Sequence, residues 1–135
     1  MSSNRHFAYQ DQYNQRPARL SFRKLHDSDI EFIAALYAST RASEMDLVDW
    51  SMEQKQAFLR QQFDAQHTYY HQQFTQAQFL LIEFDHQPCG RIYIDRRKEE
   101  IRLIDIALVP ELRSHGIGSA LMNELIHEAE TAQLP

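Results

Sequence analysis

The spacing of apolar residues changes near residue 77, and this change restricts the chain to folds that combine helices with an antiparallel sheet. Before it, apolar residues recur every three or four positions, which is the period of a helix. After it come three short apolar runs, 78–84, 89–94 and 101–109, separated by the turn segments 85–88 and 95–100. Such short connections make successive strands antiparallel neighbours. We therefore predict an α/β protein of the α+β type, with an antiparallel meander flanked by helices.

The residues before this change predict one strand, at 20–25, and two helices. Asp27 is placed to cap a helix over about 27–39, because its carboxylate can accept from the free amides of the first turn. Segment 40–50 lacks a period and is predicted to be a loop, and Ser51 with Gln54 forms the capping-box pattern of a second helix. One face of that helix carries Leu59, Phe63, His67, Tyr70 and Phe74. We interpret this stripe as core packing, with a heme or nucleobase platform or a partner-docking face as alternatives.

Length and composition narrow the classes of function. The 135 residues correspond to one domain, and the net charge of −5 disfavours a general nucleic-acid binder. The longest apolar run, 32–38, is much shorter than the roughly 18 residues of a membrane span, and the first residues do not resemble a signal peptide. The single cysteine, Cys89, fits a reducing compartment. We expect a cytoplasmic protein without membrane or nucleic-acid partners, whose polar residues 1–18 form a flexible leader.

The segment from Val109 to Ser119 carries the clearest chemical signal. A strand, a short loop and two glycines, Gly116 and Gly118, lead directly into an amphipathic helix. Glycines leave backbone amides uncovered, and the first amides of a helix lack internal acceptors at the positive end of its dipole. This arrangement predicts a phosphate or pyrophosphate site, with Arg113 as an added charged contact. A plain turn from strand to helix is the alternative.

Two common nucleotide-binding motifs do not fit this segment. A P-loop requires lysine followed by serine or threonine after its last glycine, whereas Ser119 follows Gly118 here. A dinucleotide fingerprint requires a third glycine where this chain has Leu121, and it follows a parallel βαβ unit rather than an antiparallel meander.

The pattern Arg113-x-x-Gly116-x-Gly118 resembles the pyrophosphate-binding motif Gln/Arg-x-x-Gly-x-Gly/Ala of the GNAT superfamily of N-acetyltransferases. The surrounding residues 104–121 and the order of elements are similar to this family as well, over about residues 19–133. The resemblance implies the acyl-CoA N-acyltransferase fold, with a mixed, mostly antiparallel sheet flanked by helices. It implies an enzyme that moves an acetyl group from acetyl-CoA to a primary amine, by direct attack in a ternary complex.

The same resemblance implies which residues bind the substrates. The amides of 114–119 would hold the pyrophosphate, while the strand end 106–109 would pair with the pantetheine arm. The implied cofactor-binding residues are Ile106, Ala107, Leu108, Val109, Arg113, Ser114, His115, Gly116, Ile117, Gly118 and Ser119. Segment 40–50 corresponds to a loop that often contacts the acceptor, so Glu44 and Asp46 are candidates for attracting a cationic amine. A solvated loop explains these two carboxylates equally well.

A general base is less apparent, because Leu103 occupies the position where some members of the family carry a glutamate. Asp105 is the nearest carboxylate, and strand alternation predicts it on the same face as Leu103, where it could receive the amine's proton through water. A salt-bridge role is the alternative. Cys89 is predicted to be buried rather than nucleophilic. His67 and His71 have helical spacing but lack a third ligand, so we expect no metal.

The family pattern continues beyond the glycine-loop helix with a strand, a helix and further strands. We therefore expect the N-acetyltransferase domain, residues 19–135, to be truncated after the CoA-binding helix, with its C-terminal strands and helix missing. An exposed strand edge would then favour a homodimer. The acceptor would be a small-molecule amine or a protein amino group. A non-catalytic acyl-CoA-binding or dimerisation module is the alternative function.

Overall fold

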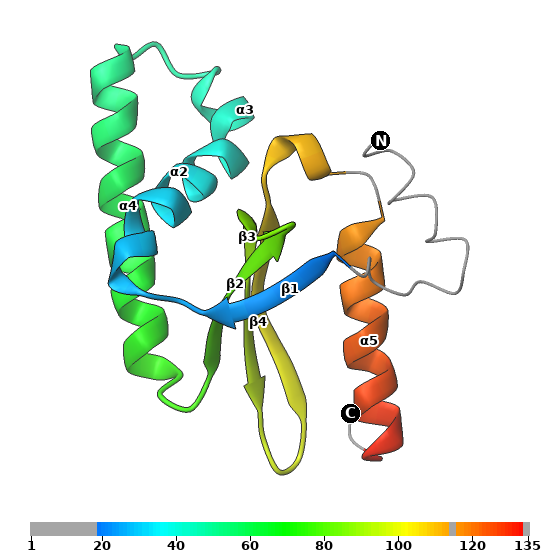
Figure 1. Cartoon of the computed structure of the whole chain (residues 1–135). Coiled ribbons are helices and arrows are strands. Elements are labelled where there is room, and N and C mark those ends of the chain that lie inside the picture. The colour runs from blue at the N-terminus through cyan, green and yellow to red at the C-terminus, as the bar shows by residue number, and fades with distance from the viewer. Residues whose placement is uncertain (1–18, 114–115, 134–135) are drawn as a thin grey trace.

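A computed structural model of the chain describes residues 19–113 and 116–133, which form a four-stranded antiparallel sheet with helices on both faces (Figure 1). The strands are β1 (Leu20–Lys24), β2 (Gln78–Phe84), β3 (Gln87–Arg96) and β4 (Ile101–Leu108), and they lie in chain order across the sheet. The predicted meander is confirmed, and β1 pairs with the free edge of β2. The predicted leader, 1–18, lies outside the described residues.

Helices cover the two faces unequally. On one face lie η2 (Asp27–Asp29), α2 (Ile30–Thr40), α3 (Ala42–Met45) and α4 (Met52–Gln73). On the other face, after η3 (Pro110–Leu112), lies α5 (Ile117–Thr131), as Figure 1 shows. The α+β architecture predicted from the sequence is therefore confirmed. Part of the predicted loop at 40–50 is helical, because α3 forms a single turn there.

Two helix starts were predicted from capping side chains, and the structure confirms one of them. The amide of Gln54 donates to Oγ of Ser51 at 3.1 Å, and the amide of Ser51 donates to Oε1 of Gln54 at 2.9 Å, so the predicted capping box is confirmed. The prediction that Asp27 caps the first helix is wrong. The chain enters this helix through the short turn η2, where the carboxylate of Asp29 accepts from the amide of His26 at 2.8 Å, and no side-chain hydrogen bond from Asp29 caps α2.

The sheet separates two apolar clusters, because residues along a strand alternate between its faces. Ile92 and Ile94 of β3 pack toward α5, together with Ile117 and Leu121. On the other face, Phe63 of α4 is completely buried in a cluster with residues of α2 and β2. The apolar stripe of α4 thus packs the core, as predicted.

A β-bulge interrupts the pairing of β3 with β4. Tyr93 pairs with Asp105 and Ile94 pairs with Leu103, so Ile104 is the extra residue. The extra residue reverses the alternation beyond it. Leu103 packs toward α5, whereas Asp105 forms an ion pair with Arg91 on the face that α4 covers. The prediction that Asp105 shares a face with Leu103 is therefore wrong.

Candidate functional site

The C-terminal end of β4, the N-terminal end of α5 and the last turn of α2 line an open cavity of about 370 Å³. Seven of the predicted cofactor-binding residues line it: Ile106, Ala107, Leu108, Arg113, Gly116, Gly118 and Ser119. Thr40 of α2 lines it as well. Sequence reasoning missed Thr40, because the contact joins segments more than sixty residues apart and no local pattern signals it. The structure thus brings most of the predicted site together.

The remaining predicted residues have different positions. Ile117 is 2% exposed and packs in the core beneath α5. Val109 is half-buried against the same core, and its amide donates to the carbonyl of Cys89 at 2.8 Å. Ser114 and His115 lie outside the described residues. We therefore expect Ile117 and Val109 to act through their backbone alone.

The start of α5 is built to leave amides free. Gly116 occupies the N-cap position with φ of 83°, a left-handed conformation that glycine adopts without strain, and among residues 19–113 and 116–133 no side-chain hydrogen bond caps the helix there. The amide of Ala120 donates to the carbonyl of Gly116 at 2.9 Å. The three amides before Ala120 therefore have no acceptor within the helix, and they point outward at the positive end of its dipole. This end of α5 can bind an anion.

Gly118 keeps the space in front of these amides open. A Cβ atom added at Gly118 would meet no atom of the described residues within 4 Å. The residue belongs to α5 and lines the cavity, so any side chain placed here would extend into the cavity. Glycine at this position therefore serves access to the helix end rather than packing.

Arg113 holds the walls of the cavity together. Its Nε donates to the carbonyl of Leu108 at 2.9 Å, and its Nη2 donates to Oγ of Ser39 at 2.8 Å. Ser39 in turn donates to the carbonyl of Leu36 at 2.6 Å. The guanidinium thus links the end of β4 to the last turn of α2. A direct contact from Arg113 to phosphate stays a prediction.

One edge of the sheet also faces this cavity. In the part of the chain that the structure describes, β4 pairs with β3 alone, so the outer peptide groups of residues 106–108 have no partner strand. An edge of this kind can pair with an extended, amide-containing chain, as a further strand would. The free edge and the free helix amides therefore border the same cavity.

Asp105 belongs to a polar cluster between the sheet and α4. Its carboxylate is ion-paired with Arg91, whose side chain is 4% exposed, while the Asp105 side chain is 24% exposed. Nη2 of Arg91 also donates to Oε1 of Gln66 on α4 at 2.9 Å, and the guanidinium lies over the ring of Tyr93. Burial raises the pKa of Tyr93 and of the neighbouring Tyr70, so both phenols are neutral at physiological pH. The structure thus shows the predicted salt bridge for Asp105, whose role as a base stays a prediction.

The two acidic residues predicted for the acceptor differ in their surroundings. Glu44 lies on α3, is largely exposed and forms an ion pair with Arg41 at 2.9 Å. Arg41 is also held by the hydroxyl of Tyr37, at 2.8 Å, so it is a fixed counterion. Asp46 follows α3 and is exposed. Of the two carboxylates, Asp46 is the better placed to attract a cation.

The single cysteine is unreactive because it is buried. Desolvation raises the pKa of the Cys89 thiol to about 12, which keeps it un-ionised and weakly nucleophilic. Among residues 19–113 and 116–133, no three histidine, cysteine or acidic side chains are grouped so that they could hold a metal ion. Within the same ranges, no helix combines the length and the apolar character needed to cross a bilayer.

Comparisons with known proteins give a consistent result. The sequence profile described as the acetyltransferase (GNAT) family matches residues 44–134. The PaiA N-acetyltransferase of Thermoplasma acidophilum, solved in complex with coenzyme A, is similar with a TM-score of 0.56 and 19% identity, over 85% of this chain and 74% of that one. A GCN5-related N-acetyltransferase of Ralstonia eutropha is similar with a TM-score of 0.50 and 15% identity, over 85% and 78% of the two chains. A search of curated proteins finds no match.

Proposed function

Because the chain belongs to the acetyltransferase (GNAT) family, we propose that it transfers an acetyl group from acetyl-CoA to a primary amine by direct attack in a ternary complex. One observation carries this proposal. The uncapped amides at the start of α5 and the unpaired edge of β4 border one cavity, at the place where the sequence motif puts the cosubstrate. An anion site next to a free strand edge suits a molecule with a pyrophosphate and a peptide-like arm.

Binding of acetyl-CoA would use both features. The pyrophosphate accepts hydrogen bonds from the amides that follow Gly116, where the helix dipole adds to the attraction. Gly118 lets the phosphates approach, because it has no side chain of its own and the other described residues leave the space at its Cβ position open. The pantetheine arm runs along residues 106–108 of β4 and exchanges backbone hydrogen bonds with them. Arg113 keeps these two surfaces at a fixed separation.

The chemical step then depends on positioning and charge stabilisation. The amine nitrogen forms a bond to the thioester carbonyl carbon, and the C–S bond breaks to release coenzyme A as its thiol. A backbone amide of β4 donates to the carbonyl oxygen and stabilises the negative charge that develops on it. Asp105 receives one proton of the acceptor ammonium through water before the neutral amine attacks. The second proton that the nitrogen loses as the amide forms passes through water to the departing thiolate. The partial exposure of Asp105 and its position on the same face as Ala107 support its role.

The acceptor is a small-molecule amine or a protein amino group. The net charge of −5 attracts a cation over a distance, and Asp46 supplies a carboxylate beside the turn after α2. Glu44 contributes less, because Arg41 already neutralises it. A cationic acceptor approaching this turn would reach the end of β4, since Thr40 lines the cavity there.

The proposal is tested by calorimetric titration with coenzyme A and with pantetheine, which lacks the pyrophosphate. Coenzyme A is expected to bind about a hundredfold more tightly, since hydrogen bonds to a charged group are worth about 1.5–3 kcal/mol each. Equal affinities would show that the start of α5 holds no pyrophosphate. Thiol release from acetyl-CoA over a panel of amines then tests catalysis. Tight binding without thiol release from any amine would leave a non-catalytic acyl-CoA-binding module.

A further inference from the structure

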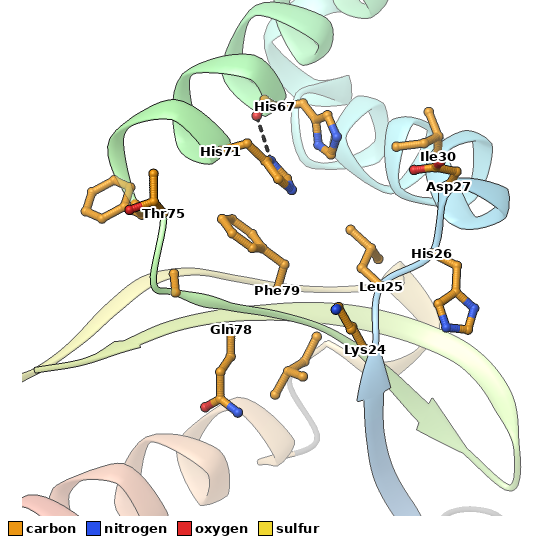
Figure 2. A pocket seen from close by; sticks show the side chains of 13 residues that line it. Lys24, Leu25, His26, Asp27, Ile30, His67, His71, Thr75, Gln78 and Phe79 are labelled. Carbon is orange, nitrogen blue, oxygen red and sulfur yellow. Dashed lines mark hydrogen bonds between the residues drawn. The ribbon is translucent and has the colours of Figure 1, made fainter.

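A cavity of about 520 Å³ lies too far from the proposed acetyl-CoA site to hold the acceptor amine. It opens where β2 starts, and Figure 2 shows the rings of His71 and Phe79, whose centroids are 4.0 Å apart, facing Leu25 across it. Strands β2, β3 and β4 are antiparallel neighbours, so the start of β2 and the end of β4 lie at opposite ends of the sheet. About four residues of strand, on the order of 15 Å, separate these ends. The acceptor must therefore be recognised at the end of the sheet where β4 ends.

The turn that connects α3 to α4 lies at this end. The last turns of α4 line the distant cavity, so the start of α4 lies at the opposite end of that helix (Figure 1). Arg41, which follows the cavity residue Thr40, donates to Oε1 of Gln62 on α4 at 2.7 Å. Phe58 lies one helical turn before Gln62, and the ring of Trp50 meets it edge-on, with centroids 5.3 Å apart. The turn therefore lies on the order of 10 Å from the wall of the acetyl-CoA cavity.

Large apolar side chains are exposed on this turn. Within six consecutive residues, Leu47 is 88% exposed, Trp50 is 43% exposed and Met52 is 69% exposed. Elsewhere among residues 19–113 and 116–133, the large apolar side chains with comparable exposure lie on α4 and α5, far along the chain. Exposed apolar side chains that are gathered in one place mark interaction surfaces, and a fixed aromatic ring is a common anchor in them. Phe58 supplies this fixation for Trp50.

The charges on the same turn have one sign. Asp46, Asp49 and Glu53 are exposed, and within the part of the chain that the structure describes none of them forms an ion pair. Glu44 differs from them, because Arg41 neutralises it. Segment 42–54 contains neither lysine nor arginine. The turn therefore complements a partner that combines positive charge with a large apolar side chain.

We propose that the acceptor is a polypeptide whose terminal amino group enters the active site while its next residues, lysine or arginine beside a large apolar residue, lie on the turn between α3 and α4. This inference rests on the proposed acetyl transfer and assigns its acceptor to the protein class. An extended chain advances about 3.3–3.6 Å per residue, so its third to fifth residues reach the turn, whereas a small amine held in the cavity does not. The terminal nitrogen gains the acetyl group, coenzyme A leaves as its thiol, and one proton is released to solvent.

Tryptophan fluorescence tests binding without depending on catalysis, because Trp50 is the single tryptophan of the chain and belongs to the turn. The whole chain, with coenzyme A present, is titrated with the peptide Ala-Ala-Lys-Leu-Lys-Ala amide. A second peptide carries glutamate in place of both lysines, and a third carries serine in place of leucine. We expect the first peptide to bind about tenfold more tightly than either of the others. No saturable change below about 1 mM of the first peptide, or equal affinities for the three, would overturn the proposal.

Two substitutions and two matched controls locate the binding surface. Leu47→Ser and Asp49→Asn alter exposed side chains of the turn, and each should weaken the first peptide about three- to tenfold. Tyr69→Ser, at an exposed position on α4, and Glu99→Gln, in the turn between β3 and β4, should leave its affinity unchanged. Coenzyme A titration and melting curves show whether each variant is folded. Wild-type affinity in folded Leu47→Ser and Asp49→Asn contradicts the proposal.

Thiol release distinguishes a wrong acceptor class from a wrong reaction. Alaninamide offers a similar amino group without the following chain, so the first peptide should have a kcat/KM at least about tenfold higher. If alaninamide reacts as well as the peptide, the acceptor assignment is wrong and acetyl transfer stands. If the peptide and all small amines fail to release thiol, the proposed function fails and the acceptor assignment fails with it.

Discussion

Replacing Gly118 by leucine tests the proposed acetyl-CoA site most directly, because the substitution fills the space in front of the helix amides without disturbing the fold. In the part of the chain that the structure describes, a side chain at this position meets no neighbour within 4 Å of its Cβ, and the residue already lies in α5. Leucine is a better helix former than glycine, by about 0.5–1 kcal/mol within a helix. The free energy of unfolding should therefore stay equal or rise, with a melting temperature up to about 3 °C higher.

The effect on coenzyme A should be large and opposite. The leucine side chain occupies the space in front of the free amides that follow Gly116, so the pyrophosphate cannot reach them. Loss of two hydrogen bonds to a charged group costs about 3 kcal/mol or more, which corresponds to at least about a hundredfold weaker binding. At a concentration of coenzyme A near 100 times the wild-type Kd, the ligand stabilises the wild type by about 2.7 kcal/mol. It should hardly shift the melting temperature of the variant.

Two matched measurements separate this effect from general damage. Gly118→Ala adds a single methyl group to the same position and should keep the affinity for coenzyme A within about threefold of wild type. Pantetheine, which has no pyrophosphate, should bind Gly118→Leu and wild type equally. If Gly118→Leu is folded and binds coenzyme A as tightly as wild type, the reasoning from the free amides is refuted.

Three further predictions concern the pairing of β3 with β4, the carboxylate of Asp29 and the acetyl-transfer step. Gly90→Ala should lower the free energy of unfolding by about 2–4 kcal/mol, because the new Cβ would clash with the backbone of β4. Denaturant titration measures this loss, and a value below about 0.5 kcal/mol would contradict the prediction. The Arg23 guanidinium lowers the pKa of Asp29 from 3.8 to about 2, so Asp29 stabilises the fold above about pH 4 and loses this effect as the pH falls toward 2. Asp29→Asn should therefore cost about 2 kcal/mol at pH 7 and nothing below pH 2, and a cost independent of pH would argue against the ion pair. Asp105→Asn should lower kcat by about a hundredfold without weakening acetyl-CoA binding, measured by thiol release and titration, whereas an unchanged kcat would remove Asp105 as the base.

Features that depend on neighbouring residues were predictable from the sequence. The capping box of Ser51 and Gln54 and the bounds of β2 follow from a few consecutive residues, and the structure confirms them. The glycine motif also predicted three residues of the cavity, Arg113, Gly116 and Gly118, because its geometry is local to the start of α5, whereas residues 106–108 were predicted from the family resemblance. In each of these cases the atoms that decide the structure are adjacent in the chain.

Features that depend on distant partners were missed. Asp29 rather than Asp27 closes the turn before the first helix by accepting from the amide of His26, and it also accepts from Arg23 of β1, at 2.8 Å. The hydrogen bond from Arg113 to Ser39 joins residues separated by 74 positions. Local propensity ranks neighbouring aspartates almost equally, so the tertiary contact decides between them.

The bulge in β4 shows how a distant partner and the local pattern together determine the position of a functional side chain. The large apolar residues of this strand that pack toward α5 are Ile101, Leu103, Ile106 and Leu108. Their spacing of two, three and two cannot be met by a regular strand, which places every second residue on one face. An uninterrupted strand would bring Asp105 into the apolar core beneath α5, where an unpaired carboxylate costs several kcal/mol. The bulge at Ile104 leaves one residue unpaired, which costs less free energy than burying an unpaired carboxylate. It also brings Asp105 to the guanidinium of Arg91. The change from a spacing of two to three is visible in the sequence, so the face on which Asp105 lies follows from the apolar residues around it.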